Sequence, residues 1–322
     1  MNDSAKSPPP LHKVAVMGAG AVGSFYGAML ARAGHRVTLI GRPAHVQAIQ
    51  RDGLQLEMGR QLHTVRVEAS SDPSAVAGAD LVLCCVKSGD TEDAARQIAP
   101  HLGPATLLMS LQNGVGNAET LARLLPCRVI PAVVYVAVAL GGPGRVCHFG
   151  RGDLAIGAMP GGTQSSVPEW PTLQALVDFF AGAQVPVRIV PDVAVELWAK
   201  LLVNCAYNAI SGLAQMPYAR LAEQADIRAL QDDVVREVIA VAAASGLTLP
   251  LDASLDAVRR IAVGMPQQLS STAQDMAKRK PSEIDHLNGY IARRGRELGV
   301  PTPVNRTLYA LVKLVESGYG AP

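Results

Sequence analysis

The order of hydrophobic and polar positions changes character once along the chain, near residue 190. Before that point, short apolar runs typical of buried strands, such as residues 80–86 and 105–111, alternate with stretches of helical periodicity. Continuous runs of this kind indicate strands that are covered on both faces. Beyond residue 192 the strand pattern disappears and long helical periodicity replaces it. The pattern predicts an α/β domain with a doubly wound sheet over residues 13–191 and an all-helical domain over residues 192–322.

Two further segments bear on export and on membranes. Residues 1–12 are predicted to be a flexible polar tail, with no apolar stretch long enough for a signal peptide. The longest apolar run, residues 129–140, is interrupted by Pro131 and is too short to cross a bilayer, so we expect it to be a buried strand. We therefore expect a cytoplasmic protein that binds no membrane.

Composition excludes two other classes of function. The formal net charge is +2 and the basic residues are scattered, which argues against a nucleic-acid surface. The five cysteines and seven histidines show no metal-binding spacing, so no metal site is predicted and the cysteines are expected to be reduced, buried thiols.

A glycine-rich turn joins the first predicted strand to the first helix. Residues 13–17 are an apolar run, residues 24–33 are rich in alanine, and residues 36–40 resemble the next strand. In this context a GxGxxG turn is the dinucleotide fingerprint of a Rossmann-type sheet, and the helix N-terminus faces the phosphates. The alternative is a turn that only packs. The predicted cofactor-binding residues here are Gly18, Ala19, Gly20, Ala21, Val22 and Gly23.

The end of the second strand indicates which dinucleotide binds. A site for NAD usually has an acidic residue there, but this chain has Ile40-Gly-Arg42. A guanidinium would pair with a 2′-phosphate, so Arg42 predicts NADP(H) as the cofactor. The alternative is that Arg42 is a solvated loop residue.

Lys87 and Asn113 follow the two buried runs at residues 80–86 and 105–111. Ligands in such folds bind outside the carboxyl ends of the strands. Lys87 is therefore a candidate for contact with the cofactor ribose or phosphate, and Asn113 for a bridge between nicotinamide and substrate. The alternative for both is a role in the turn, since Asn-Gly is a common turn dipeptide.

Lys200, Asn204 and Asn208 recur every four residues in a segment without Gly or Pro. This spacing places them on one face of a helix. A cation beside two amides is typical of a face that binds a ligand and donates a proton, whereas the alternative is a solvated polar face. Further along, Pro281 is predicted to begin a helix, and Glu283 is either an acid that compensates its dipole or a partner of Lys200.

Taken together, these motifs resemble the ketopantoate reductase (2-dehydropantoate 2-reductase) family from Val14 to about Val315. The resemblance rests on the glycine fingerprint, Leu111-Gln-Asn-Gly114, Trp198-Ala-Lys-Leu-Leu-Val-Asn204 with Asn208, Ser270-Ser-Thr-Ala-Gln-Asp275 and Glu283-Ile-Asp285. It implies an N-terminal Rossmann domain, a helical C-terminal domain, an active site in the cleft between them and a small branched 2-oxo acid as substrate.

On the substrate side, the resemblance implies that Lys200 protonates the ketone oxygen. Glu283 would position the substrate hydroxyl, order the site and count among the cofactor-binding residues. Ser271 would hold the substrate carboxylate, and Asn204 and Asn208 would contact the substrate. These implied roles favour the catalytic interpretation of Glu283 over the surface one.

On the cofactor side, the resemblance implies that Asn113 contacts both cofactor and substrate. It places the cofactor arginine and lysine of the family at Arg42 and Lys87, and the small residue that lines the nicotinamide at Ala137.

One position departs from the family pattern. Tyr218, eighteen positions after Lys200, stands where typical members have a substrate-contacting asparagine. A related reductase that acts on another 2-oxo acid or an imine, and a non-catalytic NADPH-binding sensor, are therefore the alternatives. A helical second half is also compatible with a homodimer.

Overall fold

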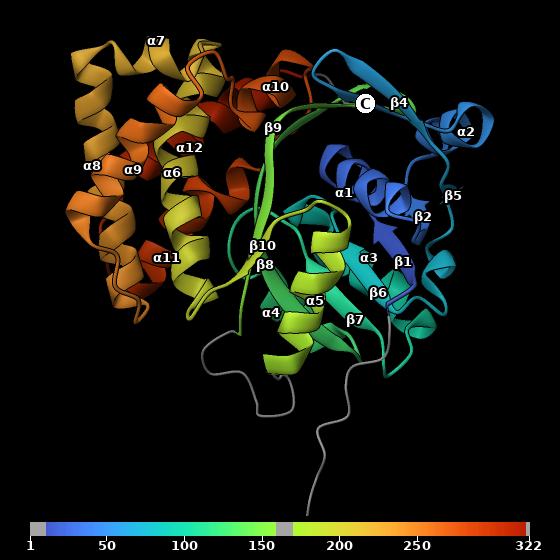
Figure 1. Ribbon diagram of the computed structural model, residues 1–322. Helices are drawn as coiled ribbons and strands as arrows, with labels where there is room; N and C mark the ends of the chain where they lie inside the picture. The colour runs from blue at the N-terminus through green and yellow to red at the C-terminus, as the bar shows by residue number, and fades with distance from the viewer. Residues whose placement is uncertain (1–10, 159–169, 320–322) are drawn as a thin grey trace, which may run out of the picture. The chain divides into compact units, whose positions relative to one another are not determined.

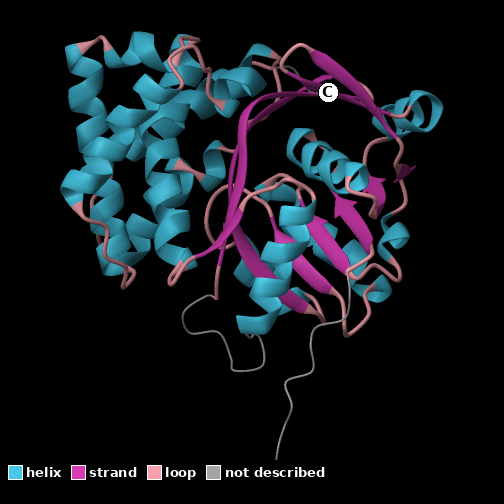
Figure 2. Ribbon diagram, viewed as in Figure 1, coloured by secondary structure: helices cyan, strands magenta, loops and turns pink. Residues whose placement is uncertain are grey.

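The computed structural model describes residues 11–158 and 170–319. The chain divides into two compact units, Met1–Val193 and Ala194–Pro322. Every strand of the described residues belongs to the first unit, and the second consists of helices and loops (Figure 2). Most of the predicted tail, residues 1–10, lies outside the described residues.

The described strands of the N-terminal unit form one sheet (Figure 1). The strands are β1 (Lys13–Met17), β2 (Arg36–Ile40), β3 (Leu54–Met58), β4 (Gln61–Val65), β5 (Glu68–Ser70), β6 (Leu81–Cys84), β7 (Leu107–Ser110), β8 (Arg128–Gly142), β9 (Arg145–Ile156) and β10 (Val187–Ile189). Their order is β4-β3-β9-β8-β7-β6-β1-β2-β5, with β10 beside β9.

The part of this sheet from β5 to β8 is wholly parallel, in the order β5-β2-β1-β6-β7-β8. The chain starts at β1 in the middle and winds outward in both directions, which confirms the predicted doubly wound sheet. The direction of winding reverses between β1 and β6, and ligands in such sheets bind outside the carboxyl ends of the strands at that point.

Helices cover both faces of the sheet. They are α1 (Ala21–Arg32), α2 (Pro43–Asp52), α3 (Thr91–Ile98), α4 (Asn117–Leu124) and α5 (Trp170–Gly182), with short 3₁₀ turns η1 (Pro73–Val76), η2 (Ser88–Asp90) and η3 (Ala99–His101). Val14 and Val16 of β1 pack in a core cluster with α1 and α5, whereas Ala15 and Met17 pack in a second cluster with α3 and α4. Alternate side chains of one strand thus enter two cores, which explains its unbroken apolar sequence.

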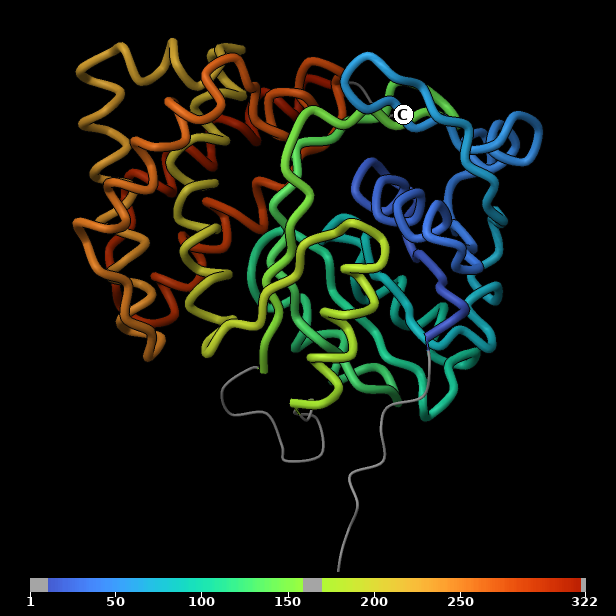
Figure 3. The backbone as a smooth tube through the Cα atoms, in the orientation of Figure 1, coloured from blue at the N-terminus to red at the C-terminus, as the bar shows by residue number. Residues whose placement is uncertain are grey.

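The apolar run at residues 129–140 lies in β8, a 15-residue strand that pairs antiparallel with β9. The two form a long ribbon (Figure 3), with register shifts between Tyr135 and Val136 and between Ala137 and Val138. Residues 129–134 are buried as expected, but residues 135–140 are only half-buried, so the prediction of a buried strand is correct for the first half alone.

The second unit contains only helical elements among its described residues. These are α6 (Val193–Ala214), α7 (Tyr218–Ala222), α8 (Ala225–Ala244), α9 (Leu251–Gly264), α10 (Ser271–Ala277), η4 (Ile284–His286), α11 (Asn288–Leu298) and α12 (Pro303–Ser317). By length and composition α6 could cross a membrane, but 67% of its apolar window is buried inside the protein, as in the central helix of a helical domain.

The helix predicted to begin at Pro281 begins instead at Asn288. The backbone N–H of Ser282 donates to the Glu316 carboxylate, and Leu287 has non-helical dihedral angles of φ −113° and ψ −109°. Tertiary hydrogen bonds therefore override the local preference of proline for a first helical turn.

Candidate functional site

The glycine turn after β1 is held by close backbone contacts. The N–H groups of Gly18 and Ala19 both donate to the carbonyl of Ile40 at the end of β2, at 3.0 and 2.8 Å. Gly18 has φ +101°, and a Cβ there would lie 2.6 Å from the backbone nitrogen of Val86. Only glycine satisfies both restrictions, so the turn is fixed between the ends of β2 and β6.

Gly20 and Gly23 serve different purposes in this turn. A Cβ on Gly23 would lie 2.3 Å from the Gly18 carbonyl oxygen and 2.7 Å from Cγ1 of Val16, so α1 packs directly on β1. A Cβ on Gly20, the N-cap of α1, would meet no atom of the described residues within 4 Å. Open space beside a helix N-terminus is what the pyrophosphate of a dinucleotide requires, so the turn fits that group.

Arg42 follows Gly41, which packs against the glycine turn. It is the exposed N-cap of α2, two residues after β2 ends. Gly41, which precedes it, packs so closely on Ala19 that a Cβ would lie 2.8 Å from the methyl group of that alanine. The backbone that carries Arg42 is therefore fixed against the fingerprint turn, as a residue that is to pair with a ribose 2′-phosphate would require.

A buried hydrogen-bond chain supports the same turn, and sequence reasoning missed it. The N–H of Gly144, between β8 and β9, donates to Nδ1 of His45 at 2.9 Å, which makes Nδ1 an acceptor and leaves the proton on Nε2. Nε2 contacts the Ser24 hydroxyl at 3.1 Å, and this hydroxyl donates to the carbonyl of Ala19 at 3.4 Å. Burial lowers the pKa of His45, which agrees with the neutral ring that this chain requires.

Lys87 and Asn113 follow β6 and β7, as the sequence predicted. Lys87 is exposed and precedes η2, and Asn113 is half-buried. The backbone carbonyl of Asn113 accepts hydrogen bonds from the Ser88 hydroxyl at 2.9 Å and from the Asn117 side chain at 2.7 Å. The two loops that carry the candidate cofactor residues are therefore joined directly.

Gln112 strengthens this junction. Its side-chain amide donates to the Thr91 hydroxyl at 2.8 Å and to the carbonyl of Val86 at 3.1 Å. Gln112 is only 4% exposed, and Thr91 is only 3% exposed. Because buried polar groups of this kind are costly unless they are paired, the network fixes both loop ends against β6 and β7. Ala137 lies elsewhere in the unit, in β8 opposite Gly150, beside a register shift.

In the helical unit, Lys200, Asn204 and Asn208 lie on α6 at the predicted spacing. Lys200 and Asn204 are half-buried, and Asn208 is 3% exposed. The Asn208 side chain donates to the hydroxyl of Ser271, the first residue of α10, at 3.4 Å. The structure thus brings together two residues that are 63 positions apart in the sequence and that the resemblance assigns to the substrate.

Ser270, the residue before Ser271, fixes α10 on α6. Its hydroxyl donates to the carbonyl of Asn208 at 3.2 Å and accepts from the N–H of Ala273 at 3.0 Å, so it is also the N-cap of α10. It is fully buried, whereas Ser271 is exposed. The two serines therefore have different roles. Ser270 fixes α10 on α6, and Ser271 has an exposed side chain whose hydroxyl contacts Asn208.

Glu283 and Tyr218 occupy different environments in the helical unit. Glu283 is half-buried in the segment that leads into η4. Tyr218, the first residue of α7, is 8% exposed, and its ring packs at 4.7 Å from that of Tyr207 on α6. Burial raises the pKa of Tyr218 well above its usual value. A buried aromatic ring therefore stands where the resemblance implies an amide.

Among the described residues, no group of three or more His, Cys, Asp or Glu side chains could hold a metal ion. All five cysteines are free. Cys84, Cys127 and Cys205 are buried as expected, and burial raises the pKa of Cys84 to about 12. Cys85, which follows β6, and Cys147, which lies within β9, are only half-buried, so the expectation of buried thiols is wrong for these two.

The fold and these residues define a two-domain, dinucleotide-binding protein of the oxidoreductase class. Comparison with known proteins specifies it further: the family model described as Ketopantoate reductase PanE/ApbA matches residues 14–161, and the model of its C-terminal part matches residues 192–316. The chain belongs to the ketopantoate reductase family.

Individual relatives and solved structures agree with this assignment. The chain is 33% identical to a 2-dehydropantoate 2-reductase of Halobacterium salinarum, over 94% of this chain and 99% of that protein. A ketopantoate reductase family structure from Ralstonia eutropha superposes with a TM-score of 0.88 at 54% identity, covering 96% of this chain and all of the other. A D-mandelate dehydrogenase solved with NADH and anilino(oxo)acetate gives the same TM-score at 25% identity, with the same coverage.

Gly20 and Gly23 provide a paired test of the turn. We expect Gly23→Ala to destabilise the protein by at least about 2 kcal/mol, because the added methyl overlaps the Gly18 carbonyl. We expect Gly20→Ala to change stability by less than about 1 kcal/mol and to weaken NADPH binding by about tenfold or more. Thermal unfolding and fluorescence titration with NADPH measure the two effects. Unchanged NADPH affinity in a folded Gly20→Ala variant would contradict the assignment of the turn.

The His45 chain predicts a pH dependence of stability. The pKa of His45 is lowered by burial from its ordinary value of 6.5, so the unfolded chain takes up the proton first as the pH falls. The stabilisation from neutral His45 is therefore complete above about pH 6.5 and is lost as the pH falls toward the folded-state pKa. We expect His45→Asn, which retains an acceptor but does not titrate, to lose less Tm than the wild type between pH 7.5 and 5.5. Equal losses would exclude His45 as the source.

Proposed function

We propose that the protein reduces 2-dehydropantoate (ketopantoate) to pantoate with NADPH. The observation that carries this proposal is the polar face of α6, where Lys200 and Asn204 are followed by Asn208 in contact with Ser271. A helix that serves only packing has no need of a cation, two amides and a neighbouring hydroxyl on one face. Family membership and full-length similarity to 2-dehydropantoate 2-reductases support the same reaction.

The residues of the helical unit each have a separate role in binding or reducing the substrate. When bound, the reduced nicotinamide supplies the hydride to the C2 carbonyl. Lys200 stabilises the alkoxide that develops on the carbonyl oxygen and donates a proton to it. Ser271 and Asn208 hold the substrate carboxylate and the groups beside it, and Glu283 accepts from the substrate hydroxyl. In this scheme Lys200 is the general acid, and the other residues orient the carbonyl.

The residues of the N-terminal unit would hold the cofactor. The N–H groups at the start of α1 would face the pyrophosphate, Arg42 would pair with the 2′-phosphate, and Lys87 and Asn113 would contact the cofactor from the ends of β6 and β7. Ala137 would face the nicotinamide with its small side chain. The proposal places the reaction in the cytoplasm, in pantothenate biosynthesis, and is compatible with a homodimer.

A second candidate is the reduction of a bulkier 2-oxo acid. Two observations favour it: Tyr218 replaces the amide typical of the family, and a D-mandelate dehydrogenase solved with anilino(oxo)acetate has the same fold over nearly the whole chain. Imine reduction belongs to the same class, whereas a non-catalytic NADPH sensor would bind the cofactor and turn over no carbonyl substrate. Initial rates with ketopantoate, smaller aliphatic 2-oxo acids, phenylglyoxylate and a cyclic imine distinguish these alternatives.

Loss of the proposed general acid is expected to separate binding from turnover. Lys200→Ala should lower kcat for ketopantoate by about 10²- to 10⁴-fold, the usual contribution of a positioned acid. Its affinity for NADPH should be unchanged, since Lys200 contacts the substrate in the proposal. NADPH oxidation followed by absorbance, together with NADPH titration, measures both quantities. Wild-type turnover in this variant would show that another group protonates the product.

Cofactor preference provides a separate test. Arg42→Ala should raise the KM for NADPH roughly 10- to 100-fold, the value of a charge-assisted hydrogen bond. It should raise the KM for NADH much less, because NADH lacks the 2′-phosphate. Arg36→Ala, at the start of β2 and likewise exposed, serves as the control for loss of a positive charge. Parallel increases for the two cofactors would remove the 2′-phosphate assignment.

A further inference from the structure

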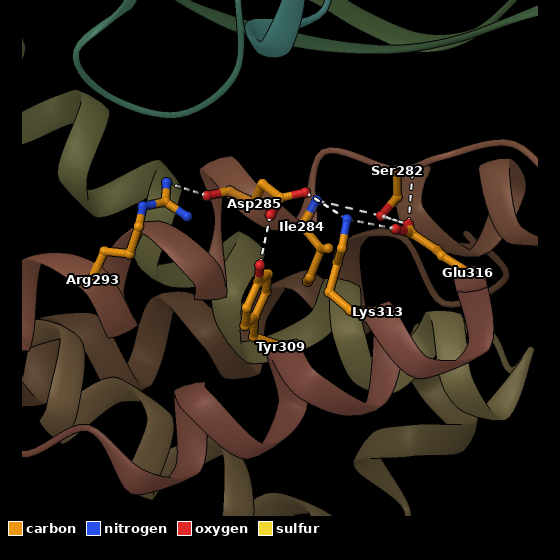
Figure 4. Close-up of polar contacts among 7 residues, drawn as sticks. All are labelled: Ser282, Ile284, Asp285, Arg293, Tyr309, Lys313 and Glu316. Carbon is orange, nitrogen blue, oxygen red and sulfur yellow. Dashed lines mark hydrogen bonds and ion pairs between the residues drawn. The ribbon is translucent and has the colours of Figure 1, made fainter.

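The segment that carries Glu283 is held at its first residues by the end of α12 (Figure 4). Both the backbone N–H and the hydroxyl of Ser282 donate to Oε1 of Glu316, at 2.8 and 2.6 Å. The same hydroxyl accepts from the N–H of Ile284 at 3.3 Å. The Glu316 carboxylate therefore fixes the backbone of Ser282, immediately before Glu283. The Ser282 hydroxyl in turn fixes the backbone of Ile284, immediately after Glu283.

The other end of the segment is held by the same helix. The Asp285 carboxylate accepts from the Tyr309 hydroxyl at 2.8 Å and from Nζ of Lys313 at 2.9 Å. Its backbone carbonyl accepts from Arg293 of α11 at 2.7 Å. Lys313 also pairs with Glu316 at 3.3 Å, so one cation joins the two contact points on either side of Glu283 (Figure 4).

Burial and charge show that this arrangement is more than a surface ion pair. The side chain of Glu316 is only 6% exposed, whereas those of Lys313 and Asp285 are 41% and 38% exposed. Burial raises the pKa of Asp285, but hydrogen bonds from Lys313 and Tyr309 outweigh it, so the net shift is downward and the carboxylate stays charged. A desolvated, charged group is a costly way to gain stability, but it fixes geometry strongly when its hydrogen bonds are complete.

We propose that Glu316, together with Lys313 and Tyr309, positions the Glu283 carboxylate for the substrate. The inference rests on the proposed function, in which Glu283 accepts from the substrate hydroxyl. Glu283 precedes a single 3₁₀ turn and lies outside any long helix or strand, so its backbone receives little support from periodic hydrogen bonds. The three side chains of α12 supply that support, and loss of it displaces the carboxylate by a distance that matters for turnover.

A double-mutant cycle tests this role. Glu316→Ala is expected to lower kcat for ketopantoate on the order of tenfold, and Glu316→Gln, which retains an acceptor oxygen for Ser282, should restore most of it. In a Glu283→Gln background, Glu316→Ala should cause no further loss of kcat, because the group on which it acts is already disabled. Its effect on the thermal midpoint should persist in both backgrounds.

Glu237 of α8 provides a matched control. Its carboxylate accepts from the backbone N–H groups of Val304 and Asn305 at 2.8 and 2.9 Å, and so fixes the opposite end of α12. Glu237→Ala should lower the thermal midpoint as Glu316→Ala does, with kcat near that of the wild type. If Glu316→Ala does not fold, Tyr309→Phe, which removes one hydrogen bond to Asp285, replaces it in the cycle with a smaller expected loss.

Two results would overturn the inference. One is a double variant whose loss of kcat equals the product of the losses in Glu316→Ala and Glu283→Gln, because the two residues would then act independently. The other is an equal loss of kcat in Glu237→Ala, which would make the effect one of general stability. Failure of the proposed function has a different signature, because the wild type itself would then show no turnover of ketopantoate. Wild-type turnover in Glu283→Gln would instead remove the role of Glu283, and the inference about Glu316 would fail with it.

Discussion

The contact between α1 and β1 is the constraint on which the cofactor half of the molecule depends. At Gly23 the helix comes so close to the strand that a single methyl group would overlap the Gly18 carbonyl. This closeness directs the N-terminus of α1 toward the carboxyl edge of the parallel sheet. The turn, the end of β2 and the loop after β6 then pack on one another, and the start of α1 is left with open space at Gly20. Anion binding there follows from the direction of the helix dipole and the orientation of its first N–H groups.

A common device fixes the segments that carry the candidate site. The fingerprint turn is supported by His45 through Ser24, the loop after β6 by Gln112, the loop after β7 by Asn117, and the segment around Glu283 by Glu316. Each segment lacks the ladder of hydrogen bonds that a strand or long helix would provide. A buried or half-buried polar side chain from a neighbouring element takes its place, donating to or accepting from the backbone of the segment. Functional groups on loops thus acquire the precision of groups on rigid elements.

The sequence predicted the features that local chemistry determines. The glycine turn was predictable because positive φ and close approach require glycine, and the α6 face because a spacing of four residues is a property of one helix. The doubly wound sheet followed from unbroken apolar strands, which need cover on both faces. The start of the helix after Pro281 was predicted wrongly, since Glu316, 34 residues away, captures Ser282. The His45 chain was equally inaccessible, because its partner Gly144 lies 99 positions along the chain. No local pattern encodes a contact of that range.

Tyr218, the position that departs from the pattern implied by the resemblance, is part of the core of the helical unit. Its ring lies against Tyr207, whose hydroxyl donates to the carbonyl of Val258 on α9. The tyrosine is therefore part of the packing between α6, α7 and α9, and substitution by asparagine would leave a cavity as well as restore an amide. The residue typical of the family cannot simply be exchanged into this chain. In the proposed function, substrate preference would therefore be coupled to the packing of the helical unit around Tyr207 and Tyr218.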